Sequence, residues 1–410
     1  MFSTSSSSLL IEPASLNFTA QHLYMKLVAP VNLFLACLTC VIISCSTSRN
    51  FRPVQPAANI KSLNLLGVYE IPYALSFNNT TVGGLSGIDY DQKKNLYYFI
   101  CDDRSAINPA RYYTAGIFIS QKGIDSLKFI SVRYLLQPDG TTYPNSKTDP
   151  QRTPDPEAIR YNPVQNKIIW SSEGERFIKE NQTVLSDPSI NINTIDGNHT
   201  GSFPLPHLLA MQAAEKGPRQ NSVLEGMCFA DNYQSLYVNV EEPLYDDGPK
   251  ADTDENNAFI RILKFDAKSK KNTRQYAYKL DPVAYPANPV NAYKINGVPD
   301  ILSTGENKLL VIERSYSSGR LACTVKLFNS DLSKASDIRH NPSLLNNKDF
   351  IAADKKLLLN MDELGIYVDN IEGVTFGPLL PNGNKTLLLV ADNNFNPIQK
   401  SQVLLFEIFE

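Results

Sequence analysis

The chain has 410 residues, with 39 Lys and Arg against 42 Asp and Glu, which gives a formal net charge of −3 at pH 7. A nucleic-acid partner is disfavoured, because such a partner calls for a basic stripe or patch that this sequence lacks. Twenty tyrosines, 19 phenylalanines and 26 prolines, together with few long helical patterns, indicate an all-β fold with many structured loops.

The N-terminal segment resembles an export signal. Lys26 and an apolar run follow Met25, and Ile42-Ile43-Ser44-Cys45 resembles a bacterial lipobox. We therefore expect residues 1–44 to be an N-terminal extension with a lipoprotein signal peptide, Cys45 to be the lipidation site and residues 45–59 to be a tether. A membrane-spanning anchor is the alternative, but the apolar run is short for one. This predicts a lipid-anchored protein of the bacterial cell envelope, either periplasmic or associated with the outer membrane.

Residues 60–410 contain an internal repeat with a period of roughly 70 residues. Each repeat starts with a short polar opener before an apolar segment and has an acidic closer after the next one. The openers are Leu85–Ile88, Glu157–Ile159, Glu225–Met227, Asp300–Ile301 and Glu372–Val374. The closers are Asp102–Arg104, Glu173–Glu175, Glu241–Glu242, Glu313–Arg314 and Asp392–Asn394.

Each repeat predicts a pair of strands joined by a polar turn. In the first repeat, strands Ser86–Tyr90 and Leu96–Ile100 flank the turn Asp91–Asn95. Repeated strand pairs predict a β-propeller with five blades, or six if a degenerate blade lies in the long connections. The first strand, Asn64–Ile71, lacks a blade and the last, Gln402–Phe409, lacks a partner. Pairing these two would close the ring and protect both sheet edges.

The connections between the predicted strands are long, which is typical of segments that form a binding site or a lid. Two of them contain apolar residues at helical spacing, Pro206–Glu215 and Lys355–Leu364. Gly365 is placed to cap the second of these short helices.

The acidic openers and closers carry the chemical prediction. A hairpin brings the start of its first strand beside the end of its second, and the first strands of a propeller line its central channel. The expected carboxylate pairs are Glu157 with Glu173, Glu225 with Glu241, Asp300 with Glu313, and Glu372 with Asp392. Such a ring of like charges is costly unless cations compensate it. Interleaved arginines or a bound Ca²⁺ would do so, with Mg²⁺ as the alternative ion, because an oxygen-only set disfavours zinc and iron.

Two other interpretations compete with a metal site. Acids at blade ends can simply hold blades together through backbone N–H groups or arginines. A Ser-His-Asp hydrolase is disfavoured, because residues 45–410 contain only His199, His207 and His340 and no Gly-x-Ser-x-Gly elbow. Ser86 stands where other repeats carry an acid, which suits a small residue at a tight strand entry.

Several segments, in the same order, resemble one protein family. They are Leu85–Tyr90, Trp170–Gly174, Glu241–Leu244, Leu310–Ser315, Asp369–Gly373 and Leu387–Phe395. Over about residues 63–410 the chain is similar to the bacterial phytase-like domain family, described as "esterase-like activity of phytase". The resemblance implies a secreted propeller that hydrolyses phosphate or carboxylic esters with calcium at a carboxylate-lined mouth. Glu157-Ala158 departs from the acid–Gly pairing, which weakens Glu157 as a ligand.

The leading hypothesis is a metal-dependent hydrolase of a small phosphate or related ester, acting as a monomer. The expected Ca²⁺ ligands are Glu173, Glu225, Glu241, Glu313, Glu372 and Asp392. Asp103 or Asp300 is the expected proton acceptor for the attacking water. Arg104 and Arg314 are the expected contacts for substrate oxygens.

Two alternatives from other classes remain. One is a non-catalytic envelope lipoprotein that binds a glycan, a peptide or a protein through its long loops. The other is a lactonase-like calcium propeller with an apolar pocket. An open mouth would favour a metal site, whereas a mouth plugged by Arg–carboxylate pairs would favour the non-catalytic alternative.

Overall fold

The computed structural model describes residues 55–179 and 182–410, so the predicted signal peptide and Cys45 lie outside the described residues. Within this part of the chain, no helix is long and apolar enough to cross a membrane. The last residues of the predicted tether bind the ring: Gln55 donates its N–H to Asn232 Oδ1 at 3.2 Å, and Ala58 donates its N–H to the Thr304 carbonyl at 3.1 Å.

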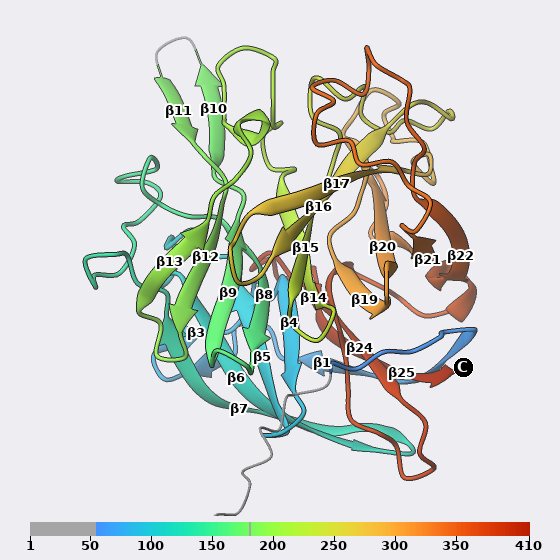
Figure 1. The fold of residues 1–410 in the computed structure, drawn as a ribbon. Coiled ribbons are helices and arrows are strands. Elements are labelled where there is room, and N and C mark those ends of the chain that lie inside the picture. Colours follow the sequence, from blue (N-terminus) through green and yellow to red (C-terminus); the bar gives the residue numbers. More distant parts are fainter. Residues whose placement is uncertain (1–54, 180–181) are drawn as a thin grey trace, which may run out of the picture. The chain divides into compact units, whose positions relative to one another are not determined.

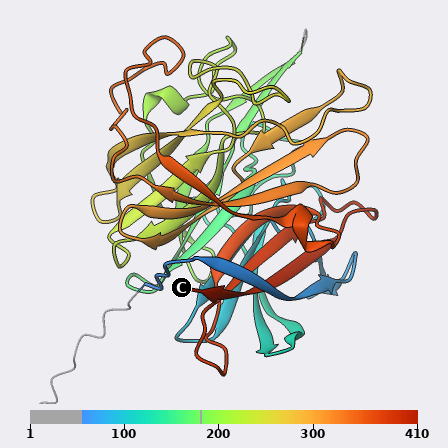
Figure 2. The same ribbon diagram turned by 90° about the vertical axis from the view of Figure 1, so that its right-hand side faces the viewer.

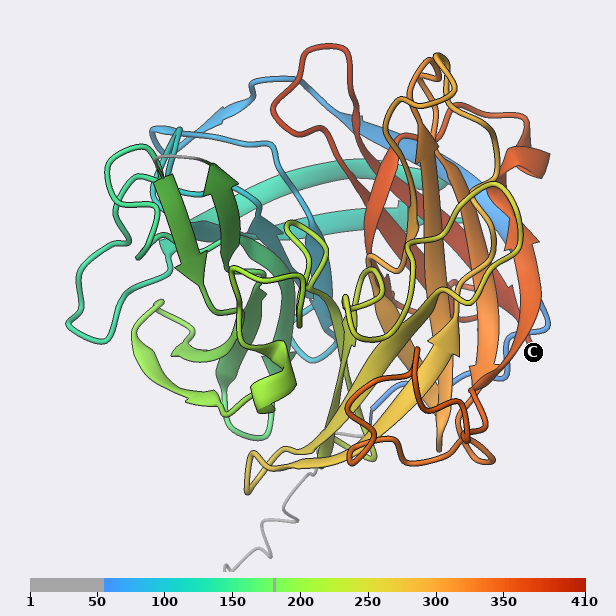
Figure 3. The ribbon, with the colours of Figure 1, turned by 90° about the horizontal axis from the view of Figure 1, so that it is seen from above.

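Five antiparallel sheets are arranged in a ring and form a five-bladed β-propeller (Figures 1 and 3). The innermost strands of the five blades contact one another in a closed cycle; they are β4 (Gly87–Asp91), β8 (Pro156–Asn162), β14 (Leu224–Ala230), β19 (Ile301–Gly305) and β23 (Asn370–Phe376). Blade one contains β4 (Gly87–Asp91), β5 (Leu96–Cys101), β6 (Arg111–Ser120) and β7 (Gly123–Tyr134). Blade two contains β8 (Pro156–Asn162), β9 (Lys167–Ser172), β12 (Ser189–Thr194) and β13 (His199–Phe203). Blade three contains β14 (Leu224–Ala230), β15 (Ser235–Val240), β16 (Phe259–Asp266) and β17 (Asn272–Lys279).

Blades four and five complete the ring and confirm the count of five. Blade four contains β18 (Lys294–Gly297), β19 (Ile301–Gly305), β20 (Lys308–Ser317), β21 (Thr324–Asp331) and β22 (Asp354–Asn360). Blade five contains β23 (Asn370–Phe376), β24 (Thr386–Asp392), β25 (Ser401–Phe409) and β1 (Ser62–Ile71). Two further hairpins are β2 (Ser76–Phe77) with β3 (Thr80–Thr81), and β10 (Glu175–Lys179) with β11 (Gln182–Ser186). The β10–β11 hairpin projects beyond the blades at the top of Figure 1.

The hydrophobic core consists of layers between neighbouring blades. Central strands such as β24 are apolar on both faces and fully buried, because each face packs against another blade. The layer between blades one and two, for example, contains Tyr98, Ile159 and Trp170. Separate clusters fill the other four junctions. Each blade is therefore stabilised by its two neighbours rather than by its own sheet.

The predicted ring closure is confirmed. Strand β1 pairs with β25 in antiparallel register from Ser62 opposite Phe409 to Ile71 opposite Ser401. Figure 2 shows β1, in blue, beside the dark red β25. The N-terminal strand thus supplies the outer strand of the blade that the C-terminal segment builds.

The two predicted helices are mostly wrong. Residues 354–360 form β22, which pairs with β21, and only Met361–Leu364 form a 3₁₀ turn, η2. Gly365 does end it with a left-handed φ of 65°. In the other segment only His207–Leu209 are helical, as η1. Short apolar spacing is ambiguous between helix and strand, and pairing with the open edge of β21 satisfies the backbone of residues 354–360.

One buried ion pair fills the axis of the ring. Arg160 Nη2 donates to Asp300 Oδ1 and Oδ2 at 2.8 and 2.7 Å, and Arg160 Nη1 donates to the Ile88 carbonyl at 2.8 Å. Asp300 also accepts the N–H groups of Met227, at 3.2 Å, and Val374, at 2.8 Å. These five residues come from five different blades, so this single pair is bonded to the whole ring.

Candidate functional site

Carboxylates from blades one to three converge at one mouth of the propeller. Oxygens of Asp102, Asp155 and Glu157 lie within 4.8 Å of one another, and so do oxygens of Glu157, Glu173 and Glu225. Glu157 belongs to both groups. One carboxylate therefore connects two adjoining sets of three, and we call these five residues the carboxylate cluster.

Burial and mutual repulsion raise the pKa of these acids. The pKa of Glu173 rises to about 8, chiefly because the side chain is buried, and Asp155 and Glu241 add to the rise. Burial and then the charge of Glu225 raise the pKa of Glu157 well above its usual range, and burial and then the charge of Glu173 do the same for Glu225. Glu173 Oε2 has no hydrogen-bond partner in the described part of the chain. The cluster therefore has an unmet need for positive charge.

Arginine neutralises the opposite side of the same mouth. Arg314 Nη2 donates to Glu241 Oε1 at 2.7 Å, and Nη1 donates to Asn370 Oδ1 at 2.5 Å and pairs with Glu372. Burial still raises the pKa of Glu241 to about 7, although the Arg314 charge opposes this rise. This side of the mouth thus has the Arg–carboxylate plug that the structural alternative predicted.

A second arginine reaches only the border of the carboxylate cluster. Arg104 pairs with Glu175, and its Nε lies 3.6 Å from Asp155 Oδ2. Within residues 55–179 and 182–410, no basic side chain forms an ion pair with Glu157, Glu173 or Glu225. The uncompensated charge is therefore confined to the side of blades one to three.

Adjacent acids in one closer have different surroundings. Asp102 points into the mouth, where burial and then Asp155 raise its pKa well above the usual range. Asp103, one residue on, accepts Ala106 and Asn108 N–H groups at 2.7 and 2.8 Å and pairs with buried Arg111 at 2.7 Å. Asp103 therefore shapes the loop after β5, and Asp102 contributes to the mouth.

Two of the other expected site residues lie in the scaffold. Asp300 belongs to the axial pair with Arg160 and not to the mouth. Glu313 accepts hydrogen bonds from Tyr278 Oη, Asn296 Nδ2 and Lys355 Nζ at 2.8, 2.8 and 2.6 Å. The Ile312 N–H donates to the Asp300 carbonyl, as the hairpin predicts. The side chains of Asp300 and Glu313 nevertheless have different partners and do not form the expected pair.

Asp392 is held at the mouth by a strained loop. Its Oδ1 accepts the Asn394 N–H at 2.9 Å, and Oδ2 has no hydrogen-bond partner among the described residues. Asn393 Oδ1 accepts the N–H of Gly84 in the segment before blade one, at 3.1 Å. Phe395 has a φ of 49°, which is unusual for a bulky residue, and a Cβ at Gly84 would lie 2.6 Å from its ring. This packing fixes the loop between β24 and β25 of blade five against the segment before blade one, and so positions Asp392.

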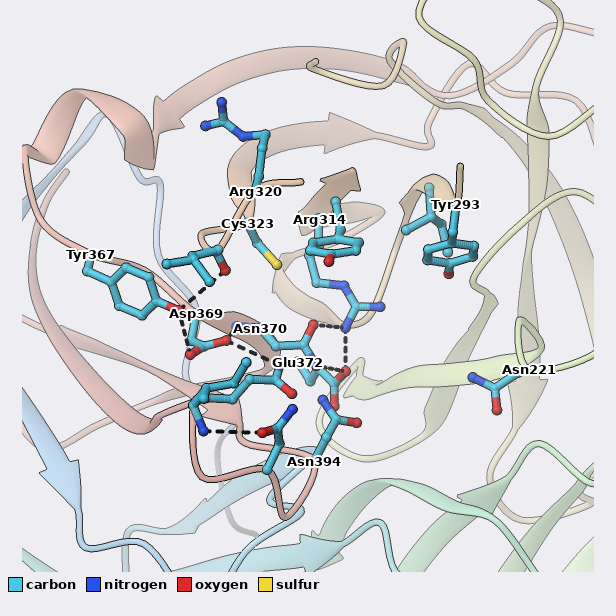
Figure 4. Close-up of a pocket in the computed structure, with 16 residues that line it drawn as sticks. Asn221, Tyr293, Arg314, Arg320, Cys323, Tyr367, Asp369, Asn370, Glu372 and Asn394 are labelled. Carbon is cyan, nitrogen blue, oxygen red and sulfur yellow. Dashed lines mark hydrogen bonds and ion pairs between the residues drawn. The ribbon is translucent and has the colours of Figure 1, made fainter. Parts of the chain in front are cut away.

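A cavity of about 380 Å³ adjoins the arginine side of the mouth, over blades four and five. Arg314 and Glu372 form its wall towards the carboxylates, and Figure 4 shows them beside Asn370. Tyr293, Tyr367 and several amides complete the lining. Its volume is near the lower end of the range of about 300–1,000 Å³ that is typical of small-molecule pockets.

The sequence prediction omitted three members of the carboxylate cluster from its ligand set. The sequence favours Asp103 over Asp102, and the Ala158 that replaces the expected glycine weakens Glu157 as a ligand. Asp155, two residues before Glu157, is absent from the expected set. Its place just before the predicted opener Glu157–Ile159 is the sequence signal that points to it.

Solved structures resemble this chain weakly, and one sequence family matches most of it. Among curated proteins, no sequence matches this chain. An α-L-arabinofuranosidase from Lactobacillus brevis is 12% identical, covers 79% of this chain and 91% of its own, and superposes with a TM-score of 0.41. A gluconolactonase from Xanthomonas campestris is 11% identical, covers 88% and 99%, and has a TM-score of 0.31. Neither likeness is strong enough to bear on function.

The sequence model of the Phytase-like family, described as "Esterase-like activity of phytase", matches residues 80–395. This range includes all five innermost strands, the carboxylate cluster, Arg314 and Asp392. It covers well over half of the 410 residues. The chain belongs to the Phytase-like family.

Proposed function

We propose that this protein is a calcium-dependent hydrolase of a phosphate or related ester. The observation that carries the proposal is the carboxylate cluster, two groups of three acids that share Glu157 beside a cavity of about 380 Å³. Membership of the Phytase-like family supports a hydrolytic function. Fold alone would not, because propellers serve many functions.

The cluster suits a hard cation. Asp102, Glu157, Glu173 and Glu225 offer only carboxylate oxygens, which Ca²⁺ prefers and takes in sets of six to eight with water. Buried Glu173 Oε2, which lacks a partner among the described residues, is the oxygen most in need of one. Mg²⁺ is the alternative ion. Of the ligands expected from the sequence, Glu241 and Glu372 are bound by Arg314, so we place the ion on the other side of the mouth.

Bound calcium would lower the pKa of a coordinated water and offset charge on the ester. Asp392 is our candidate proton acceptor, because its Oδ2 has no hydrogen-bond partner within the described chain and its charge interacts with both Asp102 and Glu372. Asp103 and Asp300, which the sequence suggested for this role, have their oxygens engaged in the scaffold.

Both arginines that the sequence predicts as substrate contacts have N–H groups without a hydrogen-bond partner among the described residues. Arg314 lines the cavity, and its Nε has no hydrogen-bond partner within the described residues. Arg104 Nε and Nη2 are likewise without one. We assign to both the role of orienting ester oxygens between the cavity and the carboxylate cluster.

The test is calcium removal with a count of the bound ion. Chelation is expected to lower kcat/KM on a panel of phosphomonoesters and carboxylic esters by about 100-fold, and added calcium should restore it. Glu157→Gln should lose both calcium and activity, because this carboxylate serves both groups. The matched control is Glu255→Gln, in an exposed ion pair with Lys279, which should keep both.

Hydrolysis that is unchanged after verified removal of the metal would refute the proposal. Calcium binding without turnover on any ester would favour the non-catalytic lipoprotein propeller instead. Thermal unfolding of each variant separates loss of the metal from loss of the fold.

We also propose lipid attachment at Cys45 and a place in the bacterial cell envelope. The lipobox-like Ile42–Cys45 supports this proposal, and Cys45 lies outside the described residues. Mass spectrometry of the mature N-terminus tests it, since an unmodified Cys45 in membrane-extracted protein would contradict it.

A further inference from the structure

The cavity over blades four and five contains polar groups that the scaffold does not use. Asn221 and Asn394 line it with side-chain amides, and Tyr293 and Tyr316 line it with phenol hydroxyls (Figure 4 labels the first three). Within the described part of the chain, none of these four groups makes a hydrogen bond. Asn221 and Asn394 have φ values of 51° and 46°, a left-handed conformation that asparagine tolerates.

These free groups match hydroxyls better than anions. An amide and a phenol can each both donate and accept a hydrogen bond, and so can an alcohol hydroxyl. A ligand that bears only acceptors would pair with the N–H and O–H donors of these groups but would leave their acceptor oxygens without a partner. A purely apolar ring would leave all of it unpaired, which is unfavourable once water is displaced.

The charge of the lining also disfavours a polyanion. Arg314 and Arg320 contribute two positive charges, and Asp369 and Glu372 contribute two negative charges, so the net charge is 2 − 2 = 0. Asp369 already accepts hydrogen bonds from the Tyr367 hydroxyl at 2.9 Å and from the Lys400 backbone N–H at 2.7 Å. A ring with many phosphates would find no excess positive charge here.

Apolar surface completes the lining. The rings of Tyr293 and Tyr316 lie 6.2 Å apart between centroids and are tilted by 40°. Leu321 and Ile398, both exposed, also line the cavity. A ligand with hydroxyls at its edge and C–H groups on its faces would use both kinds of wall.

We propose that this cavity binds the alcohol portion of the ester as one neutral, hydroxyl-bearing sugar ring. The ester group then points past Arg314 to the carboxylate cluster. This inference rests on the proposed function where it concerns hydrolysis of the ester, whereas binding of the sugar ring does not depend on that function. It predicts a monosaccharide monoester as substrate, in preference to an aryl ester or a highly phosphorylated ring.

The kinetic test compares hexose monophosphates, phenyl phosphate and inositol hexakisphosphate in the presence of calcium. Hexose monophosphates should have the highest kcat/KM, by about tenfold. Tyr293→Ala and Tyr316→Phe should raise KM for the hexose phosphates by about 5–10-fold, with little change in kcat and no change for phenyl phosphate. The matched control is Tyr134→Ala, an exposed tyrosine on the outer strand of blade one, which should change neither constant.

A binding test keeps this inference separate from the proposed function. Methyl glucoside, galactoside and mannoside cannot undergo ester hydrolysis, so saturation-transfer NMR on the full protein reports occupation of the cavity alone. Binding of at least one glycoside that Tyr293→Ala and Tyr316→Phe both weaken supports the sugar site, even if no ester is hydrolysed. If none binds, or if phenyl phosphate or inositol hexakisphosphate is the preferred substrate, the sugar site is wrong even though hydrolysis stands.

Discussion

Without a cation, protons must neutralise the carboxylate cluster. Burial raises the pKa of Glu173 to about 8 and that of Asp155 to about 6, and it raises the pKa of Glu157 well above its usual range. Each of these groups binds its proton more tightly in the folded protein than in the unfolded chain. Folding of the metal-free protein therefore takes up protons, and its stability depends on pH.

The linkage between proton binding and folding gives the direction in which stability changes with pH. A carboxyl whose pKa is raised by folding contributes full stability below its unfolded pKa and loses that contribution as pH rises to its folded pKa. We expect the melting temperature of chelated protein to fall between about pH 4.5, the ordinary pKa of a glutamate, and about pH 8, the pKa of Glu173 in the folded protein. Calcium should restore stability most strongly at the upper end, where the carboxylates are ionised.

Scanning calorimetry with chelator and with calcium, from pH 5 to pH 8, provides the measurement. Glu173→Gln should reduce the fall in melting temperature with rising pH, because it removes a carboxyl whose pKa is about 8 in the folded protein. A calcium effect that does not increase with pH would contradict this account of the cluster.

At the scale of elements, strand β1 protects the last blade. Its residues pair with β25 along nine positions of register, and Leu63 and Leu65 pack on the core between blades four and five. Without β1, the edge of β25 would present unpaired N–H and C=O groups, which invite association between chains. Closure by the N-terminal strand therefore protects blade five from both unfolding and aggregation.

A chain that begins at Tyr73, and so lacks β1, is expected to aggregate or to melt at least about 10 °C lower. Val68→Thr changes an exposed side chain of β1 but keeps its backbone bonds, and should behave as the full chain does. Size-exclusion chromatography and thermal unfolding compare the two. A monomeric truncated chain with an unchanged melting temperature would show that closure is dispensable.

For the whole molecule, the Arg160–Asp300 pair is the common contact of the ring. Both side chains are buried, and their hydrogen bonds reach backbone groups of blades one, three and five as well as their own. Gly226 allows this approach, since a Cβ there would lie 2.6 Å from the Asp300 Cα. Breaking this pair should therefore destabilise the innermost strand of every blade.

Asp300→Asn is expected to cost about 3–5 kcal/mol, because it leaves Arg160 buried without its counter-ion. Hydrogen exchange should then increase in the innermost strands of all five blades. The matched control is Asp247→Asn, which breaks an equally buried pair with Arg261, with N–O distances of 2.7 Å, away from the axis. Its effect should stay within blade three and the adjoining loops. Exchange confined to blade four in Asp300→Asn would contradict a ring-wide role.

Much of the fold was predictable because the signals are local. Turn residues between β-branched and aromatic runs, such as Asp91–Asn95, predicted the hairpins, and two unmatched terminal strands predicted the closure. Residues 355–364 were misjudged because their apolar spacing suits both a helix and a strand. Only the free edge of β21, formed by residues 324–331, decided between them.

The sequence by itself determined the family, the five repeated hairpins, the closure by β1 and the gathering of acids at hairpin ends, because each follows from local pattern and strand pairing. Only the tertiary structure decided what each acid does. Asp300 turned inward to Arg160, Glu313 was engaged by Tyr278 and Lys355, and Asp102 with Glu157 joined Glu173 and Glu225. The charge of a carboxylate is written in the sequence, but its compensation depends on which donors distant segments bring within about 3 Å of it.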